Sequence, residues 1–349
     1  MIGSCARRSI LEIHDLLILD LDGTVYRGEE PITGATEVLS SARKNGTTVR
    51  FVTNNASRAP DEVRAILREF RIDAADGEIY TSARAGALTT ADLVPAGALV
   101  LVVGSPALTH EVRCAGLRPV FTADPPPSAV VQGLSPGTTW RELAEATIAV
   151  RSGAQWIACN DDITLPSARG LLPGNGSLVG VIRAATDRTP VVAGKPARAL
   201  FDHAVAGTPA RRPLVVGDRL DTDIAGASAA GLDSMLVLSG VSSPGDLLTA
   251  APTSRPRYVS ADVSGLFGPS ERAEIAPHSD WCVAITGAVV ILSGRPGRTN
   301  RAEPLDALRA LCAAWWSAGG GRPELVAEDS SARSALRGLG LLNDHAVVS

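Results

Sequence analysis

The sequence predicts an α/β protein whose chain, up to about residue 260, forms a Rossmann-like parallel sheet with helices between the strands. Short apolar runs recur along this part of the chain, and they are continuous rather than alternating, as expected of strands buried on both faces. Helical patterns lie between most of these runs. Strands that alternate with helices form parallel βαβ units, so a parallel sheet follows.

The strands are predicted from apolar runs bounded by Gly, Pro, Asp or Asn. They cover residues 16–20, 49–53, 99–103, 129–132, 156–159, 191–193, 214–217 and 235–238.

The helices are predicted from their apolar spacing and their end signals. They cover residues 35–45, 61–70, 140–151 and 223–230. The first, third and fourth stop at Gly46, Gly153 and Gly231, and glycine is a frequent C-cap. The second follows a proline, and a pair of threonines that can supply the N-cap precedes the third.

The last part of the chain has a different pattern. A stretch rich in Gly, Ser and charged residues, ending near residue 279, is interpreted as a linker. Two apolar runs follow over 281–292 and predict a hairpin around Thr286 and Gly287. A helix over 305–316, a strand over 324–327 and a helix over 332–337 complete a segment long enough to form a small separate α/β domain.

Composition and charge exclude several classes of protein. The chain has 349 residues, with 33 Lys+Arg against 37 Asp+Glu, and no long basic run, which argues against non-specific nucleic-acid binding. No apolar run approaches the roughly 20 residues of a membrane span, and no signal peptide is evident. Five scattered cysteines without a C-x-x-C pair argue against a disulfide framework and a cysteine zinc site. We therefore expect a cytoplasmic protein without a membrane partner.

The first chemical motif is Asp20-Leu21-Asp22-Gly23-Thr24. An apolar strand delivers Asp20 at its carboxyl end, where open α/β sheets place their ligands. Asp22 follows two residues later, and Gly23 allows the chain to turn. Two carboxylates at the end of a buried strand are electrostatically costly unless a cation lies between them. The alternative interpretation is a solvated Asp-Gly turn with an incidental second acid.

A second acidic cluster covers residues 217–223 and again ends an apolar strand. Carboxylate sites suit Mg²⁺, which takes one or two carboxylates, waters and substrate phosphate oxygens. Asp221, Thr222 or Asp223 could instead simply cap the following helix. Capping does not account for Asp218 at the tip of the strand.

Two further strand ends carry groups suited to phosphate. Thr53, Asn54 and Asn55 offer a hydroxyl and amides, although such residues are also common in turns. Lys195 can supply a positive charge to a phosphoryl group. It is not a Walker A lysine, because Pro196 stands where Ser or Thr should be. Acids, hydroxyl and lysine together are the parts needed for Mg²⁺-assisted phosphoryl transfer through a carboxylate nucleophile.

These four segments resemble, in order, the four motifs of the haloacid dehalogenase superfamily of phosphatases. The insert between the second and third motifs, and the segments Asn160-Asp161-Asp162 and Pro173-Gly174-Asn175-Gly176 within it, resemble the type IIA, 4-nitrophenylphosphatase-like subfamily. The resemblance implies a core of residues 10–82 and 190–260, an inserted α/β cap of residues 83–189, and a C-terminal accessory domain of residues 261–349. That tail is similar to the acetyltransferase-like tail of actinobacterial glycerol-3-phosphate phosphatases, and we expect it to be catalytically silent.

The resemblance also implies roles for individual residues. Asp20 would be the nucleophile that forms an aspartyl-phosphate, and Asp22 the acid and base. Mg²⁺ would be held by Asp20, the backbone carbonyl of Asp22, and Asp218. The remaining implied roles are a second shell around the metal for Asp223, phosphoryl binding for Thr53, Asn54, Asn55 and Lys195, and reading of the leaving group by Asn160, Thr164 and Leu165 of the cap.

A small phosphorylated substrate is expected beneath a cap of this size. The family resemblance places glycerol 3-phosphate first. Phosphoglycolate, a nucleotide or 4-nitrophenyl phosphate are the alternatives within the same class. A non-catalytic regulatory binding protein is the alternative from another class, and phosphoryl transfer to an acceptor other than water is a third. The sequence leaves the oligomeric state open, and the family resemblance favours a homodimer formed through the cap.

Overall fold

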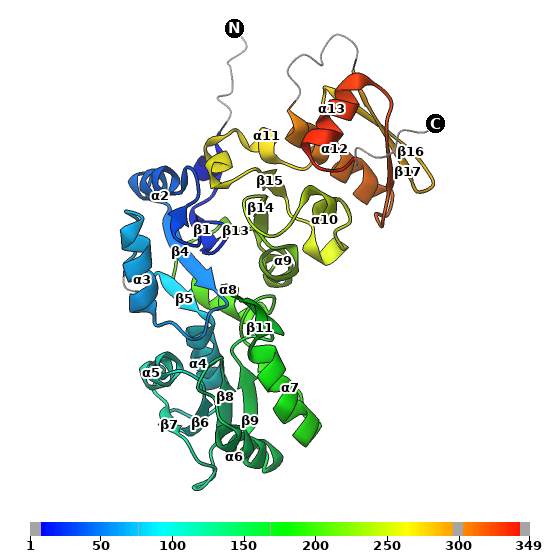
Figure 1. Ribbon diagram of the computed structural model, residues 1–349. Coiled ribbons are helices and arrows are strands. Elements are labelled where there is room, and N and C mark those ends of the chain that lie inside the picture. The colour runs from blue at the N-terminus through cyan, green and yellow to red at the C-terminus, as the bar shows by residue number, and fades with distance from the viewer. Residues whose placement is uncertain (1–7, 76, 168, 296–302, 343–349) are drawn as a thin grey trace. The chain divides into compact units, whose positions relative to one another are not determined.

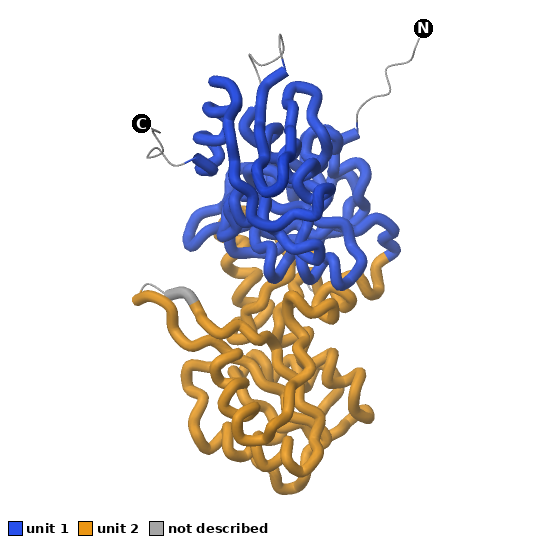
Figure 2. Tube along the Cα trace, turned by 90° about the vertical axis from the view of Figure 1, so that its right-hand side faces the viewer, with its two compact units in different colours: residues 1–49, 209–349 blue, residues 50–208 orange. Residues whose placement is uncertain are grey.

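The computed structural model describes residues 8–75, 77–167, 169–295 and 303–342 (Figure 1). The chain divides into two compact units, one of residues 1–49 and 209–349 and the other of residues 50–208 (Figure 2). None of the helices within the described ranges has both the length and the apolar character needed to cross a membrane. Each unit is described in turn.

The first unit contains a parallel sheet with the strand order β15-β14-β13-β1. Almost every residue of these strands is buried, which is why their sequences are continuously apolar. The parallel sheet predicted from the apolar runs is confirmed, and β15 is a strand that the sequence did not predict. The strands are β1 (Leu16–Asp20), β13 (Pro213–Gly217), β14 (Asp233–Val237) and β15 (Tyr258–Ser260).

Short helices and a two-stranded antiparallel pair, β2 and β3, accompany this sheet. The predicted helix 223–230 begins later, at Ala225, because a π-helical turn, η1 (Leu220–Ile224), precedes it. Gly231, at φ +72°, ends it as predicted. The elements are β2 (Tyr26–Arg27), β3 (Glu30–Pro31), α1 (Ile10–Ile13), α2 (Ala35–Lys44), α9 (Ala225–Ala230), α10 (Pro244–Leu248), α11 (Ser270–Ala273) and the 3₁₀ turns η2 (Pro252–Ser254) and η3 (Val263–Phe267).

The C-terminal segment forms a three-stranded sheet with two helices, in agreement with the predicted pattern. The hairpin of β16 and β17 turns at Gly287 and Ala288, one residue later than predicted, and β18 pairs with β17 in parallel. The elements are β16 (Trp281–Thr286), β17 (Val289–Gly294), α12 (Pro304–Ser317), β18 (Glu324–Ala327) and α13 (Ser330–Gly338).

This segment shares a hydrophobic core with the end of the parallel sheet. One cluster of buried side chains includes Leu236 and Val259 of the sheet together with Leu308 of α12. Two side-chain hydrogen bonds tie α12 to the same region. Arg309 donates to the Val259 carbonyl at 2.9 Å, and the Trp316 indole donates to the Leu248 carbonyl at 3.3 Å. The C-terminal segment therefore contributes to the stability of the first unit.

The second unit contains a five-stranded parallel sheet with the order β12-β9-β8-β6-β7. A further parallel pair joins β4, whose first two residues belong to the first unit, to β5. β10 and β11 form an antiparallel hairpin. The strands are β4 (Thr48–Thr53), β5 (Ile79–Thr81), β6 (Leu99–Val103), β7 (Arg118–Val120), β8 (Ala129–Gln132), β9 (Gln155–Ala158), β10 (Thr164–Ser167), β11 (Gly170–Pro173) and β12 (Val191–Val192).

Six helices accompany these strands among the described residues of the second unit. The predicted helix 140–151 is confirmed as α6, and Thr139 caps it by exchanging hydrogen bonds with Glu142. The sequence missed α4, α5, α7 and α8. The helices are α3 (Pro60–Glu69), α4 (Ser82–Leu93), α5 (Pro106–Cys114), α6 (Trp140–Arg151), α7 (Asn175–Thr186) and α8 (Ala199–Val205).

The shared core predicts a large stability cost for truncating Leu308, whose side chain is fully buried. Leu308→Ala should lower the free energy of unfolding by about 2–5 kcal/mol, because a cavity remains where the side chain packed. Val326→Ala, at an exposed position of β18, should cost less than about 1 kcal/mol. Urea unfolding of the full chain measures both. Equal costs for the two variants would contradict the shared core.

Candidate functional site

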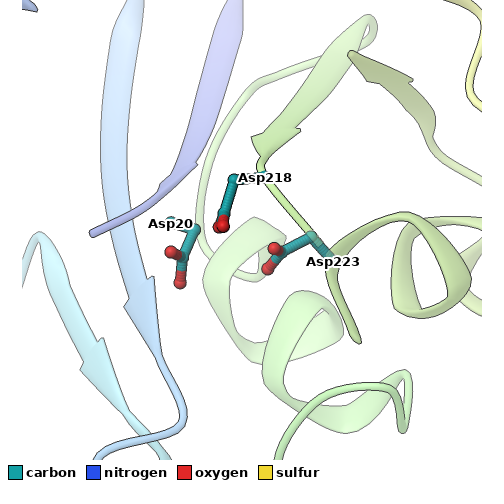
Figure 3. A group of neighbouring side chains, drawn as sticks. All are labelled: Asp20, Asp218 and Asp223. Atoms are coloured by element: carbon teal, nitrogen blue, oxygen red, sulfur yellow. The ribbon is translucent and has the colours of Figure 1, made fainter. Parts of the chain in front are cut away.

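Three buried carboxylates meet in the first unit. Asp20, Asp218 and Asp223 are 8%, 1% and 1% exposed, and each offers an oxygen that lies within 4.8 Å of the oxygens of the other two. Figure 3 shows the three carboxylate groups lying close together. Like charges at this separation in a buried site repel strongly unless a cation or protons offset the repulsion.

The sheet brings two of the acids together. β1 and β13 are neighbouring parallel strands, and their register pairs Leu19 with Val216. Asp20 ends the first strand, and Asp218 comes directly after the second. Both carboxylates therefore leave the same edge of the sheet, as the sequence predicted.

Two glycines make room for the carboxylate of Asp218. A Cβ atom on Gly240 would lie 1.9 Å from Oδ2 of Asp218, and one on Gly23 would lie 2.6 Å from it. The Val241 amide donates to Asp218 Oδ2 at 2.7 Å. The backbone thus closes tightly around this carboxylate and fixes its direction. Gly240 was missed by the sequence reasoning.

Asp223 reaches the group from the π-helical turn η1. Its Oδ2 accepts a hydrogen bond from the Arg219 amide at 3.1 Å. A Cβ on Gly217 would lie 2.3 Å from the Asp223 Cβ, so only glycine admits this side chain there. Asp221 is different, because it pairs with the Arg219 guanidinium, and that hydrogen bond holds the pKa of Asp221 below its usual value. The N-cap residues of η1 and α9 are Arg219 and Ile224, and neither makes a side-chain cap hydrogen bond, so capping does not account for Asp223.

Asp22 lies in the turn after β1, and its side chain is exposed. The turn depends on Gly23, whose φ of +88° is in the region that favours glycine. The Gly23 amide donates to the Tyr26 carbonyl at 2.7 Å, and Ser239 Oγ donates to the Gly23 carbonyl at 2.7 Å. An Asp-Gly turn is therefore present, as the alternative interpretation required, and it directly follows a buried acid that belongs to a cluster.

The group of three buried acids fits a hard divalent cation. Carboxylate oxygens are the ligands that Mg²⁺ and Ca²⁺ take in proteins, and a dication offsets the repulsion among three buried acids. A tight glycine cradle around Asp218 adds the rigidity that an octahedral Mg²⁺ site needs.

The second unit holds the predicted phosphate-binding residues. Thr53 ends β4, and its Oγ1 accepts from the Asn55 amide at 3.2 Å. The Asn55 side chain accepts from the backbone amides of Ser57 and Arg58, so it stabilises the turn. Lys195 follows β12 and is 4% exposed.

The Asn54 side chain binds protein groups on both of its ends. Its Oδ1 accepts from the Lys195 amide at 2.8 Å, and its Nδ2 donates to the Lys195 carbonyl at 3.0 Å and to Asp162 at 3.2 Å. Its backbone carbonyl accepts from Ser82 Oγ at 2.6 Å and Asn160 Nδ2 at 2.7 Å. Asn54 is thus the centre of a polar network.

The predicted cap residues lie in and after the loop that follows β9. Asn160 is buried, and its carbonyl accepts from Asn175 Nδ2 at 2.7 Å. Thr164 begins β10 and Leu165 follows it, both exposed on the β10–β11 hairpin. Ser82 and Asp162 also belong to this network, and the sequence analysis quoted Asp162 only within a family-like segment. The Asn-Asp-Asp run at 160–162 was the one signal that pointed to Asp162.

Family models match three parts of the chain. A model described as haloacid dehalogenase-like hydrolase matches residues 17–118, and a second hydrolase-like model of the same kind matches residues 192–266. A model described as a GCN5-related N-acetyltransferase-like domain matches residues 278–341. The predicted family and the acetyltransferase-like character of the tail are confirmed.

Relatives extend the similarity to nearly the whole chain. D-glycerol 3-phosphate phosphatase from Mycobacterium tuberculosis is 46% identical over 98% of this chain and 99% of that protein. A crystal structure of glycerol phosphate phosphatase from the same organism in complex with magnesium has a TM-score of 0.90, at 46% identity over 96% of this chain and 99% of that one. A 4-nitrophenylphosphatase from Thermotoga maritima has a TM-score of 0.68, at 32% identity over 74% and 98%.

The group of three buried acids predicts that bound magnesium stabilises the fold. Mg²⁺ at about 100 times its Kd should raise the free energy of unfolding by roughly 2.7 kcal/mol, because it binds only the assembled site. Thermal unfolding with and without Mg²⁺, after treatment with a chelator, measures this effect. Asp218→Asn should remove most of the magnesium-dependent shift in Tm. An equal shift in the variant would contradict the assignment of Asp218.

The close approach of Gly240 to Asp218 predicts that a single added methyl group at position 240 disturbs magnesium binding. Gly240→Ala should abolish the magnesium-dependent shift in Tm, because the new Cβ displaces the Asp218 carboxylate. Gly245→Ala is the matched control, since its Cβ would meet atoms no closer than 3.6 Å. The same thermal unfolding assay compares the two. A normal magnesium response in Gly240→Ala would show that the cradle does not set the carboxylate position.

Proposed function

The chain belongs to the haloacid dehalogenase-like hydrolases, and on that premise we propose that it is a Mg²⁺-dependent phosphatase that hydrolyses glycerol 3-phosphate to glycerol and phosphate. The observation that carries the proposal is the group of three buried carboxylates at the end of β1 and β13. Similarity over nearly the full length to a D-glycerol 3-phosphate phosphatase supports the substrate.

In the proposed reaction an Asp20 oxygen attacks phosphorus. A bond forms between Asp20 and phosphorus, the bond from phosphorus to the leaving oxygen breaks, and that oxygen takes a proton from Asp22. Asp22 then takes a proton from water, whose oxygen bonds to phosphorus and releases phosphate and the Asp20 carboxylate. The exposure of Asp22 in the turn after β1 gives it access to solvent for these proton transfers.

The positive charges of the site act on the phosphoryl group. Bound Mg²⁺ would supply electrostatic stabilisation of the phosphoryl oxygens, and Asp20, the Asp22 carbonyl and Asp218 would hold it, with Asp223 behind them. Lys195 and Thr53 bind the phosphoryl oxygens in this proposal. The charge of Lys195 reduces the repulsion between an anionic nucleophile and an anionic substrate.

We further propose that residues 83–189 form a cap over a core of residues 10–82 and 190–260, with residues 261–349 as an accessory domain. Four of the five strands of the β12-β9-β8-β6-β7 sheet lie within residues 83–189 and support the cap, while β12 follows just after them. A cap excludes water and favours a small substrate over a phosphoprotein. Asn160, Thr164 and Leu165 are then the candidates that read the leaving group.

The expected setting is the cytosol, with a small phosphorylated molecule as the partner. Cys114, Cys159, Cys282 and Cys312, which lie in the described part of the chain, are free thiols, and this supports a reducing compartment. The homodimer and the absence of a nucleic-acid partner stay predictions.

Asp20→Asn tests the proposed reaction. The variant should release phosphate from glycerol 3-phosphate at least about a thousandfold more slowly, because an amide oxygen is a poor nucleophile toward phosphorus. Phosphate release with Mg²⁺ is measured on a panel of glycerol 3-phosphate, phosphoglycolate, a nucleoside monophosphate and 4-nitrophenyl phosphate. Circular dichroism checks that the variant is folded.

The panel also separates the alternatives. A higher kcat/KM for phosphoglycolate or the nucleotide would replace glycerol 3-phosphate as the substrate. No release from any member by the intact chain, with no effect of Asp20→Asn, would favour the non-catalytic binding protein. Less free phosphate on adding an acceptor alcohol would indicate phosphoryl transfer to that acceptor.

A further inference from the structure

Asn54 stands beside the phosphate-binding lysine, yet its side chain is occupied by protein groups. An asparagine amide has one acceptor oxygen and one NH₂ donor group. Here the oxygen accepts from the Lys195 amide, and the nitrogen donates to the Lys195 carbonyl and to Asp162. Both ends of the amide therefore bind the backbone of one residue, and that residue is Lys195.

The local structure is built for this contact. A Cβ on Gly194 would lie 2.8 Å from Asn54 Oδ1 and 2.4 Å from the Cys159 carbonyl. A larger residue before Lys195 would therefore push the Lys195 segment away from Asn54. The Asn54 carbonyl is held in turn by Ser82 and Asn160. Asn54 is therefore fixed on its backbone and on its side chain.

The third contact of the amide reaches the loop after β9. Asp162 accepts from Asn54 Nδ2, and the Asp162 amide donates to Asn160 Oδ1 at 3.3 Å. The Asp162 carbonyl accepts from Gly176 at the start of α7 at 2.9 Å. One amide thus connects the lysine to a loop that lies in the proposed cap.

We propose that Asn54 is a positioning residue that acts through Lys195, fixing the backbone from which the Lys195 ammonium projects and linking it to Asp162. This inference rests on the proposed function, because it assigns Lys195 to the phosphoryl group. Because Asn54 holds Lys195 by a matched donor and acceptor, loss of its side chain lets the ammonium shift, and a shift of about 1 Å in a positioned group can cost a hundredfold in rate.

A double-mutant cycle tests this role. Asn54→Ala should lower kcat/KM for glycerol 3-phosphate by about 10- to 100-fold in the full chain with Mg²⁺. In the Lys195→Ala background the same change should cost less than about twofold, because the group that Asn54 positions is gone. Asn45→Ala, at the exposed end of α2, is the control and should stay within about twofold. Effects that multiply in the double variant would overturn the proposal.

A second measurement does not depend on activity. The chain has two lysines, Lys44 and Lys195, and Lys44 is exposed at the end of α2. Reductive methylation followed by mass spectrometry gives the rate at each lysine, with Lys44 as the internal reference. Asn54→Ala should raise the rate at Lys195 at least about threefold relative to Lys44. An unchanged ratio in the folded variant would overturn the proposal, whether or not the protein is a phosphatase.

A charge exchange tests the link to Asp162 and guards against a variant that fails to fold. Asn54→Asp places two carboxylates together and should lower kcat/KM more than Asn54→Ala does. Adding Asp162→Asn restores a donor between the two positions and should recover kcat/KM to at least the Asn54→Ala value. No recovery would contradict the link. If the intact chain releases no phosphate from any substrate of the panel, the proposed function fails, and the methylation ratio alone decides this inference.

Discussion

Repulsion among the carboxylates of Asp20, Asp218 and Asp223 is the constraint on which the rest of the site depends. Three acids with oxygens within 4.8 Å of one another, almost entirely removed from water, are not a stable arrangement by themselves. The fold nevertheless holds them together through strand register and through glycines whose missing Cβ atoms leave space for Asp218 and Asp223. A protein that maintains such a group is shaped to hold a cation, and the proposed phosphatase reaction depends on that cation.

The elements that carry the three acids were accessible from the sequence to different degrees. β1 and β13 are continuously apolar because both of their faces are buried, so the strands and the acids at their ends could be predicted. The π-helical turn η1 could not, since a widened helical turn has no apolar period of its own. Gly240 is far from Asp218 along the chain, and only the folded structure shows that its missing Cβ makes room for a carboxylate.

The role of Asn54 illustrates a more general limit. A polar side chain at the end of a parallel strand has the same sequence signal whether it faces a ligand or the backbone of a neighbouring strand end. The sequence placed Asn54 and Asn55 with the phosphate-binding residues, and that assignment stays a prediction. In the structure the Asn55 side chain holds its own turn, and the Asn54 side chain binds the Lys195 backbone. The sequence analysis missed the β10–β11 hairpin for another reason: its strands are short and contain Pro and Gly.

The backbone N–H and C=O groups of Lys195 explain why residue 54 is an asparagine. The backbone of one residue offers an N–H donor and a C=O acceptor, in two successive peptide groups, and a side chain that binds both needs an acceptor and a donor at a fixed separation. An aspartate lacks the donor, and a threonine would have to use one hydroxyl oxygen as both donor and acceptor. Asparagine satisfies both and adds no charge beside a cation that must act on the substrate. In the proposed site the three acids would hold the metal, and the neutral amide of Asn54 would fix the backbone of the lysine.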